Sequence, residues 1–428
     1  MTLFCVISAS SVAAQIITSA PDLKTALAAA KPGAELRLAP GQYGSLRLGR
    51  DFAEGGESVT LRSDDPARPA VFSGMLAQGA AGITLQDLMF DYTFTEGDNA
   101  TQLRPFQIIS STDISIRHSI FDGDLARGIA GSGNGYAAAQ GLAIKSAKRI
   151  TIEDSVFRVW HRGLVIGHSD NIVLRGNDFH SMRSDGADFV AVQHVLIEGN
   201  WFHDFRRSPA STDHPDMIQF WTNRSKRPST HITIRGNILN VGAGMPTQSI
   251  FMRNEEVDTG RMGQEMFYRA IEISQNVIIN GHLHGITVGA TDGLTIRNNT
   301  LIRNLGAMGK GKDKKPALHT PSIRVAGNAV GVVITNNIVG KIAPDLRKTP
   351  RPAWDVAGNL FIQDSALLAP GFYGRVFAPA PSGNQTAGNQ AALIPFVYRP
   401  DGPAGTGTVG AAMLQPGAVL NSSGQAAP

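Results

Sequence analysis

The segments that decide the fold are Ile172–Phe179 (IVLRGNDF) and Val195–Phe202 (VLIEGNWF), which begin 23 residues apart. Each reads apolar, any, apolar, two polar or small residues, Asn, any, apolar. The same pattern, with Ser or Asn at its sixth position, recurs at Ile114–Phe121, Ile150–Phe157, Ile232–Leu239, Ile271–Ile278, Leu294–Leu301 and Val332–Val339, and Ile83–Phe90 is a degenerate first copy. Self-similarity at a short spacing is the signature of a repeat architecture.

A unit of 22 or 23 residues is too short for a strand–helix–strand crossover. It fits one turn of a parallel β-solenoid, in which longer turns carry loop insertions. Alternation with a period of two places Ile, Val, Leu and Phe inside the coil. Leucine-rich repeats and propellers need other spacings. The sixth positions should stack at one corner, where they can bond the turn backbone and each other. These residues are Ser119, Ser155, Asn177, Asn200, Asn237, Asn276, Asn299 and Asn337.

The composition excludes several other classes of protein. Of the 428 residues, 42% are apolar, which is ample for a large core and excludes a wholly disordered chain. No run approaches about 18 consecutive apolar residues, so we expect no transmembrane helix. Cys5 is the only cysteine, which excludes a disulfide framework and a cysteine-based zinc site. The net charge of +4 suits an acidic polymer, and no nucleic-acid motif accompanies it.

The chain divides into three segments. Residues 1–15 carry no charge, contain a short apolar stretch and end near the candidate cleavage site Val12–Ala14, which predicts a signal peptide and a secreted or periplasmic protein. Residues 16–345 should form the solenoid, opened by an amphipathic helix at Ala20–Lys31 that caps its exposed end. Residues 346–428, rich in Pro, Ala and Gly, should form irregular coils packed on the far end.

Each turn should carry a second strand before the one that bears Ser or Asn. Its outward residues should stack in rows, turn on turn, about 4.8 Å apart. Groups that are distant in the sequence then meet in space. Three such rows are expected: Arg162, Asp185, Asp216, Gln248 and His284; then Asp188 and Gln219; then Lys145, Trp221 and Arg253.

The carboxylates of Asp185, Asp188 and Asp216 are the unusual part of this face. Like charges held together either raise each other's pKa or bind a cation, and oxygen ligands suit calcium. Aspartates that merely decorate turns are the alternative. Trp221 should point outward, where a sugar ring can stack, and His284 is a candidate proton donor or substrate contact. The remaining histidines of this region are expected at the surface or in turns: His161, His168, His180, His194 and His203.

The cap helix followed by Pro32–Tyr43 (PGAELRLAPGQY), the repeats, and the closing segment Arg399–Ala411 (RPDGPAGTGTVGA) resemble right-handed parallel β-helix proteins of the pectate-lyase-like superfamily. The resemblance covers roughly residues 20–340. It implies an all-β fold, a single right-handed parallel β-helix with an N-terminal capping helix. We expect a monomer whose partner is an acidic polysaccharide, with neither nucleic acid nor a membrane as partner.

The resemblance further implies a polysaccharide lyase that cuts a uronate polymer by β-elimination. Such a reaction needs a cation to neutralise the uronate carboxylate, a base for the C5 proton and an acid for O4. Arginine is an awkward base because its pKa exceeds about 12, whereas histidine titrates near neutral pH. The implied calcium ligands are Asp185, Asp188 and Asp216; the implied base is Arg253, with Lys145 or His214 as substitutes; and the implied substrate contacts are Arg162 and Gln219.

Three alternatives stay open. Ser184–Asp188 (SDGAD) and Pro215–Gln219 (PDMIQ) loosely resemble the stacked aspartates of polygalacturonases, where two carboxylates serve as acid and base. A uronate C5-epimerase shares the proton abstraction, and the order Asp213–His214–Pro215–Asp216 is an imperfect match to its Asp-Pro-His motif. A non-catalytic glycan-binding solenoid would carry aromatic ladders without converging acids.

Overall fold

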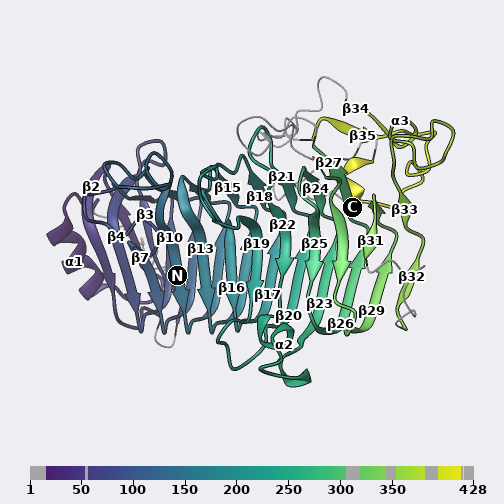
Figure 1. Cartoon of the computed structure of the whole chain (residues 1–428). Helices are drawn as coiled ribbons and strands as arrows, with labels where there is room; N and C mark the ends of the chain where they lie inside the picture. The colour runs from purple at the N-terminus through teal and green to yellow at the C-terminus, as the bar shows by residue number, and fades with distance from the viewer. Residues whose placement is uncertain are drawn as a thin grey trace, which may run out of the picture.

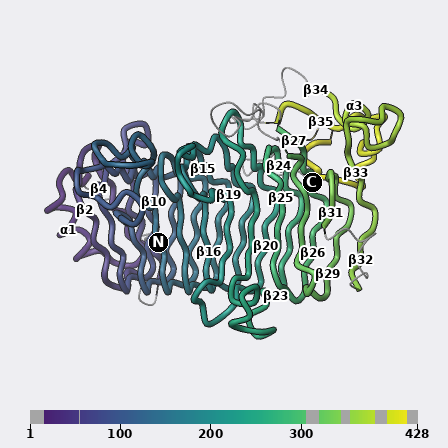
Figure 2. The backbone as a smooth tube through the Cα atoms, in the orientation of Figure 1, coloured from purple at the N-terminus to yellow at the C-terminus, as the bar shows by residue number. Residues whose placement is uncertain are grey.

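The computed structural model describes residues 16–53, 56–304, 319–343, 353–380, 394–415 and 418. Over these residues the chain winds into a long right-handed parallel β-helix, as predicted (Figures 1 and 2). The predicted signal peptide at residues 1–15 lies outside the described residues, so the secreted or periplasmic location stays a prediction. No helix in the described ranges has the length and apolar character of a membrane span.

Three parallel ladders run along the coil, and each complete turn adds one strand to each ladder. We call them sheets A, B and C. Sheet A contains β1 (Glu35–Leu38), β3 (Val59–Ser63), β5 (Ala81–Gln86), β8 (Thr112–Arg117), β11 (Lys148–Glu153), β14 (Asp170–Arg175), β17 (Gln193–Glu198), β20 (Thr230–Arg235), β23 (Tyr268–Ser274), β26 (Thr291–Arg297), β29 (Val330–Thr335) and β32 (Asp355–Ala357).

Sheet B holds the strands that precede the Asn-bearing ones, and sheet C holds the short strands that follow. Sheet B contains β2 (Gly41–Leu48), β4 (Ala70–Gln78), β7 (Phe106–Ile109), β10 (Ala138–Lys145), β13 (Trp160–Gly167), β16 (Ala187–Val190), β19 (Asp216–Trp221), β22 (Gln248–Met252), β25 (His284–Val288), β28 (Ser322–Val325) and β31 (Ile342–Ala343). Sheet C contains β6 (Met89–Asp91), β9 (Ile120–Asp122), β12 (Val156–Arg158), β15 (Asp178–His180), β18 (Trp201–His203), β21 (Ile238–Asn240), β24 (Val277–Asn280), β27 (Thr300–Arg303), β30 (Ile338–Val339) and β33 (Leu360–Phe361).

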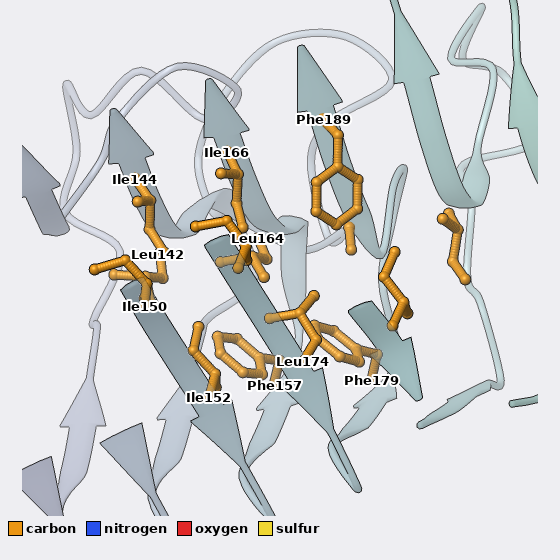
Figure 3. Packing of buried hydrophobic residues seen from close by; sticks show 14 of the residues in the cluster. Leu142, Ile144, Ile150, Ile152, Phe157, Leu164, Ile166, Leu174, Phe179 and Phe189 are labelled. Atoms are coloured by element: carbon orange, nitrogen blue, oxygen red, sulfur yellow. The ribbon is translucent and has the colours of Figure 1, made fainter. Parts of the chain in front are cut away.

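The core is the space that the three sheets enclose. Aliphatic side chains of sheets A and B fill it together with the aromatic column of sheet C (Figure 3). In that column the rings of Phe121, Phe157, Phe179 and Phe202 stack at centroid distances of 4.6, 4.8 and 4.7 Å. Each ring is fully buried, and burying such a side chain contributes about 1.5–3 kcal/mol. The period-two pattern therefore identified the inward residues correctly.

The predicted corner ladder is confirmed. Each side-chain Nδ2 donates to the Oδ1 of the next member at 2.9–3.0 Å, and each Oδ1 also accepts the backbone N–H of the member before it. The members are Asn177, Asn200, Asn237, Asn276, Asn299, Asn337 and Asn359. The Ser155 backbone N–H joins the ladder at Asn177 Oδ1, 3.0 Å away. These bonds satisfy buried amides and lock the register between turns.

The N-terminal cap is also confirmed. The helix α1 (Ala20–Ala29) begins after Ser19, whose hydroxyl accepts the Asp22 N–H at 3.3 Å. It covers the first turn of the coil with Leu23 and Leu27, which are buried. An open solenoid end exposes core and unpaired strand edges, and this helix removes that exposure.

The C-terminal part packs against sheet C. Its described residues include α3 (Tyr373–Val376), β34 (Phe377–Pro379), β35 (Phe396–Tyr398) and the short helix η3 (Ala412–Leu414). They lie along the outer face of sheet C over the last turns (upper right in Figure 1). Tyr398 is buried there and its hydroxyl bonds Thr300. This segment covers outward apolar residues of sheet C, including Ile238, Val277 and Ile302, which would otherwise form an exposed apolar patch. The predicted boundary at 345–346 falls outside the described residues.

The ladder makes a direct prediction about stability. Replacing Asn237 with Ala removes the acceptor of the Asn200 N–H and Nδ2–H and the donor to Ile197 O. Because these groups stay buried and unpaired, the free energy of unfolding should fall by about 3 kcal/mol. Denaturant unfolding of Asn237→Ala measures this, with Asn134→Ala at an exposed loop position as the control. Equal midpoints for the two variants would contradict a stabilising role for the ladder.

Candidate functional site

The outward rows of sheet B form as predicted. The pairing register sets Arg162 opposite Gln140, Asp188 opposite Gln219, and Asp216 opposite Gln248. The inward residues Ile218 and Phe220 are fully buried. Side chains separated by 20–40 residues in the sequence therefore lie on adjacent turns.

Two glycines allow neighbouring turns of the coil to approach each other closely beside the acidic residues. A Cβ on Gly163 would lie 2.7 Å from the Gly186 carbonyl oxygen, and one on Gly186 would lie 2.5 Å from that of Met217. No larger residue fits at either position without a shift of the backbone. Gly186 is therefore required by close approach between turns. The Asp185–Gly186 pair sits in a strand-to-strand contact and not in an exposed Asp-Gly turn.

Arg162 is the centre of the site, and the three predicted carboxylates surround it. Its Nε lies 3.0 Å from Asp185 Oδ2 and its Nη1 lies 3.3 Å from Asp188 Oδ2. Asp185 Oδ1 accepts the Asp216 backbone N–H at 3.0 Å. Gln219 Nε2 donates to Asp216 Oδ2 at 2.6 Å. We call Asp185, Asp188 and Asp216 the acid cluster.

The acid cluster is closed off from solvent. Asp185 is 1% exposed and Asp188 and Asp216 are 0% exposed, whereas the Arg162 side chain is 28% exposed. Burial raises the pKa of all three carboxyls, and the Asp185 charge raises those of Asp188 and Asp216 further. One guanidinium cannot balance three buried charges. We infer that the cluster keeps at least one proton at neutral pH.

A second group of charges adjoins the first, and we call it the Asp213 network. Arg183 Nε donates to Asp213 Oδ2 at 3.0 Å, and Arg207 Nη1 donates to the Asp213 carbonyl oxygen at 3.1 Å. The His161 imidazole, with Nε2 4.0 Å from Asp213 Oδ1, and the Arg183 guanidinium hold the pKa of Asp213 well below its usual value. At that distance the His161 contact is electrostatic and not a hydrogen bond.

The location of His161 differs from the one predicted. It was expected at the surface or in a turn, but it lies inside β13 and is 5% exposed. Asp213, in the loop before β19, faces it. No periodicity marks His161 as buried, because it precedes the residues of β13 that alternate regularly. Its position beside Arg162 was the only available signal.

Buried polar atoms without a hydrogen-bond partner gather around these two groups. Such atoms are rare in folded proteins, so their concentration on neighbouring turns marks a place where a ligand or water completes the bonding. They are both ring nitrogens of His161, Nε of Arg162 and of Arg207, both carboxyl oxygens of Asp188, Oδ1 of Asp216 and Oε1 of Gln248.

The third predicted row does not join the acid cluster. Arg253 follows Gln248, the partner of Asp216, by five positions, which places it about 16 Å further along the strand direction. Its guanidinium is 53% exposed and pairs with Asp258 of α2 (Glu255–Asp258) at 3.1 Å, at the lower edge of the coil in Figure 1. Lys145 lies five positions beyond Gln140 and is exposed. Residues of the first and third rows lie on the same face of sheet B but at different positions along its strands, so their side chains do not meet.

The other predicted residues lie near the site without entering the acid cluster. Trp221 is half-buried at the end of β19, in the third row. His214 is exposed, two residues before Asp216. His284 is half-buried in the first row and its Nδ1 lies 2.8 Å from Thr287 Oγ1.

The donor set does not suit calcium in this arrangement. Both Asp185 oxygens are engaged, and the Arg162 guanidinium lies between Asp185 and Asp188 where a cation would have to sit. Among the described residues, no group of three or more His, Cys, Asp or Glu side chains is placed to hold a metal ion. Calcium usually takes six to eight oxygen ligands. Its binding by Asp185, Asp188 and Asp216 remains a prediction.

Comparison with known sequences identifies the family. Residues 107–344 match the family described as "Right handed beta helix region", and because this match covers more than half of the 428 residues, the chain belongs to that family. Among curated proteins, none gives a significant match.

Solved structures with the same architecture differ in activity. The PL6 family alginate lyase AlyGC is 15% identical with a TM-score of 0.45, over 83% of this chain and 52% of the lyase, so the chain spans about half the length of that protein. The surface adhesin PfbA of Streptococcus pneumoniae is 14% identical with a TM-score of 0.48, over 82% of this chain and 80% of the adhesin. The alginate lyase AlyF-OU02 is 14% identical with a TM-score of 0.46, over 74% of this chain and 68% of that lyase. The structures to which this chain is similar thus include an adhesin and two lyases.

The raised pKa values predict how stability depends on pH. A carboxyl whose pKa is higher in the folded protein favours folding below its unfolded pKa near 4, and this contribution is lost as the pH rises through the folded pKa. Asp188→Asn removes that titration but keeps a side chain that can bond Arg162. The variant should therefore be more stable than the parent by about 1–3 kcal/mol near pH 8, with little gain near pH 4. Denaturant unfolding across this range measures the difference. A variant that is less stable at every pH would mean that Asp188 is ionised and needed for its ion pair.

Proposed function

We propose that the protein cleaves an acidic, uronate-containing polysaccharide by β-elimination outside the cytoplasm, with Arg162 as the group that meets the substrate carboxylate. The observation that carries this proposal is a guanidinium fixed by two buried aspartates yet open to solvent. An arginine held in this way can bond a carboxylate in a bidentate manner without first losing side-chain freedom. The outward rows run across several turns, which suits a polymer more than a single sugar.

The reaction would proceed by loss of the C5 proton of a uronate unit and departure of the glycosidic oxygen from C4. The electron pair of the C5–H bond forms the C4=C5 double bond, and O4 leaves with a proton. Negative charge develops on the substrate carboxylate while the C5 proton departs. Arg162 would stabilise that charge because its own charge is preorganised at the site.

The proton donor and the base would come from the two groups of buried charges. A general acid requires a carboxyl whose pKa is raised far enough for it to keep its proton at neutral pH. Burial and the charges of Asp185 and Asp188 raise the pKa of Asp216 well above its usual value, and Gln219 covers its Oδ2; a substrate that displaces the Gln219 amide would reach it. His161 is the candidate base, because its ring nitrogens have no hydrogen-bond partner and Asp213 faces the imidazole. Arg253, Lys145 and His214 remain alternatives for this role.

Hydrolysis is the second candidate. It is favoured by the raised pKa values of Asp188 and Asp216 on adjacent turns, since an inverting hydrolase needs one protonated and one ionised carboxyl. Incubation with alginate, polygalacturonate and glucuronan separates the candidates. Unsaturated ends, detected by ultraviolet absorbance, indicate elimination. New reducing ends without that absorbance indicate hydrolysis, altered uronate stereochemistry without cleavage indicates epimerisation, and binding without any change indicates a glycan-binding protein.

The two arginine assignments give different results in mutants. Arg162→Gln should lower kcat/KM by at least about a hundredfold, because it removes the charge that stabilises the transition state. Arg162→Lys should recover only part of the loss, since lysine cannot bond a carboxylate through two parallel N–H groups. Initial rates of double-bond formation measure both. If Arg162→Gln keeps full activity and Arg253→Gln is inactive, then Arg253 and not Arg162 stabilises the charge on the substrate carboxylate.

Chelation tests the calcium expectation. If Arg162 supplies the positive charge, dialysis against EDTA should leave the rate of cleavage within about twofold of the untreated protein, because no step then depends on a bound cation. Rates before and after dialysis, and after addition of calcium, are compared on the same substrate. Loss of activity that calcium alone restores would support a calcium site at Asp185, Asp188 and Asp216 and would contradict the role given to Arg162.

A further inference from the structure

We propose that a pocket beside the Asp213 network binds one acidic sugar unit of the polymer, next to the point of cleavage. This inference rests on the proposed function for the class of ligand but not for the pocket itself. The pocket has a volume of about 360 Å³ and lies where three loops meet. Its lining residues are Tyr136, Asp204, Phe205, Arg206, Arg207, Pro209, Ala243, Gly244 and Met245.

The loops that form the pocket come from three different turns of the coil. Tyr136 belongs to the segment between β9 and β10, and the residues from Asp204 to Pro209 belong to the segment between β18 and β19. Ala243 to Met245 lie between β21 and β22. The last two segments are locked together, because Met245 N–H bonds the Phe205 carbonyl oxygen and a Cβ on Gly244 would lie 2.4 Å from that oxygen. The pocket is therefore built by the fold and does not depend on one loose loop.

The charge of the pocket favours an anion. Arg206 is exposed at the rim, and Arg207 carries a buried Nε that has no hydrogen-bond partner. The one carboxylate in the lining, Asp204, is already paired with His203 at 2.7 Å. Burial opposes the charge on His203, but hydrogen bonds to Asp178 and Asp204 outweigh this and raise its pKa to about 9. His203 is thus charged at neutral pH and is shared between Asp204 and Asp178, which weakens the charge of Asp204, so the two arginines leave the lining with a net positive charge.

The remaining lining suits a sugar ring. Phe205 and Met245 are buried and give the pocket an apolar floor, and Tyr136 offers an aromatic side chain at its wall. The volume is near the lower end of the range for small-molecule sites, about 300–1,000 Å³. An apolar floor with a cationic rim matches a pyranose ring that carries a carboxylate, and it suits a neutral sugar or a bare phosphate less well.

The pocket is connected to the candidate site through one residue. The Arg207 guanidinium bonds the carbonyl oxygen of Asp213, whose carboxylate bonds Arg183 and faces His161. A sugar held here would place the next unit of the polymer toward Arg162. The pocket would therefore determine the register of the chain at the site and the shortest oligomer that binds well.

The test uses binding, so that it does not depend on cleavage. Hexamers and dimers prepared from alginate, polygalacturonate and glucuronan are titrated calorimetrically into protein carrying Asp216→Asn, with a neutral hexaglucan for comparison. Two variants alter the pocket at exposed positions: Arg206→Gln removes charge, and Ala243→Phe removes space. Arg206→Lys keeps the charge. Lys148→Gln is the matched control, because it removes one exposed positive charge at the start of β11 in sheet A.

We expect one acidic hexamer to bind, and Arg206→Gln and Ala243→Phe each to weaken it about tenfold, as loss of one charged hydrogen bond or of ring contacts would. Arg206→Lys should recover part of the affinity, and Lys148→Gln should have no effect. The inference is overturned if no acidic hexamer binds, if both pocket variants bind it as tightly as the parent, or if the neutral hexaglucan binds equally well. If binding depends on Arg206 and Ala243 but no substrate is cleaved, the pocket stands and the proposed function fails.

Discussion

The register between successive turns is the constraint on which the structure depends. Parallel backbone pairing sets each strand opposite its equivalent in the next turn, and the asparagine ladder locks that alignment at one corner. A slip of one residue would bring every inward side chain to the surface. The same register sets Asp185 under Asp216, close enough for the Asp216 N–H to bond the Asp185 carboxylate. The site is therefore a direct product of the stacking.

The ladder and the acid cluster show two opposite uses of buried polar groups. In the ladder, the amide of Asn237 finds donors and acceptors at both neighbouring turns. At Asp188, by contrast, both carboxyl oxygens lack a hydrogen bond, and the cation that faces them, Arg162, is shared with Asp185. Burying charge without full pairing opposes folding. A long, well-packed coil can tolerate that cost, and such local instability is typical of sites that act on a ligand.

The sequence was sufficient to predict most of the fold. Alternation identified inward residues such as Phe220, and the repeated Asn identified the corner, because both depend on local periodicity. It was also sufficient to predict that Asp185, Asp188 and Asp216 meet near Arg162. It was insufficient for Arg253, because a pattern of period two assigns a face but gives no position along the strand. His161 and the pocket at Arg207 were missed for a related reason. Their neighbours come from loops, and the paths of loops are not set by the repeat.

The apolar C-terminal cover illustrates the same limit. Proline and glycine content predicts few regular strands after the coil, but the surface on which this segment packs is set by outward residues of sheet C such as Val277. Outward positions of sheet C on earlier turns, such as Ile120 and Val156, are apolar as well. The repeat pattern therefore does not tell which of these outward positions the C-terminal segment covers.

The central claim is that stacking holds buried, partly protonated carboxyls around Arg162. Carbon-13 NMR of protein labelled at the aspartate carboxyls tests it most directly, with Asp188→Asn and Asp216→Asn used to assign the signals. We expect at least one of these two carboxyl carbons to resonate at the protonated position at neutral pH and to shift only under alkaline conditions. Signals from both residues that titrate as ordinary solvent-exposed aspartates would contradict the account.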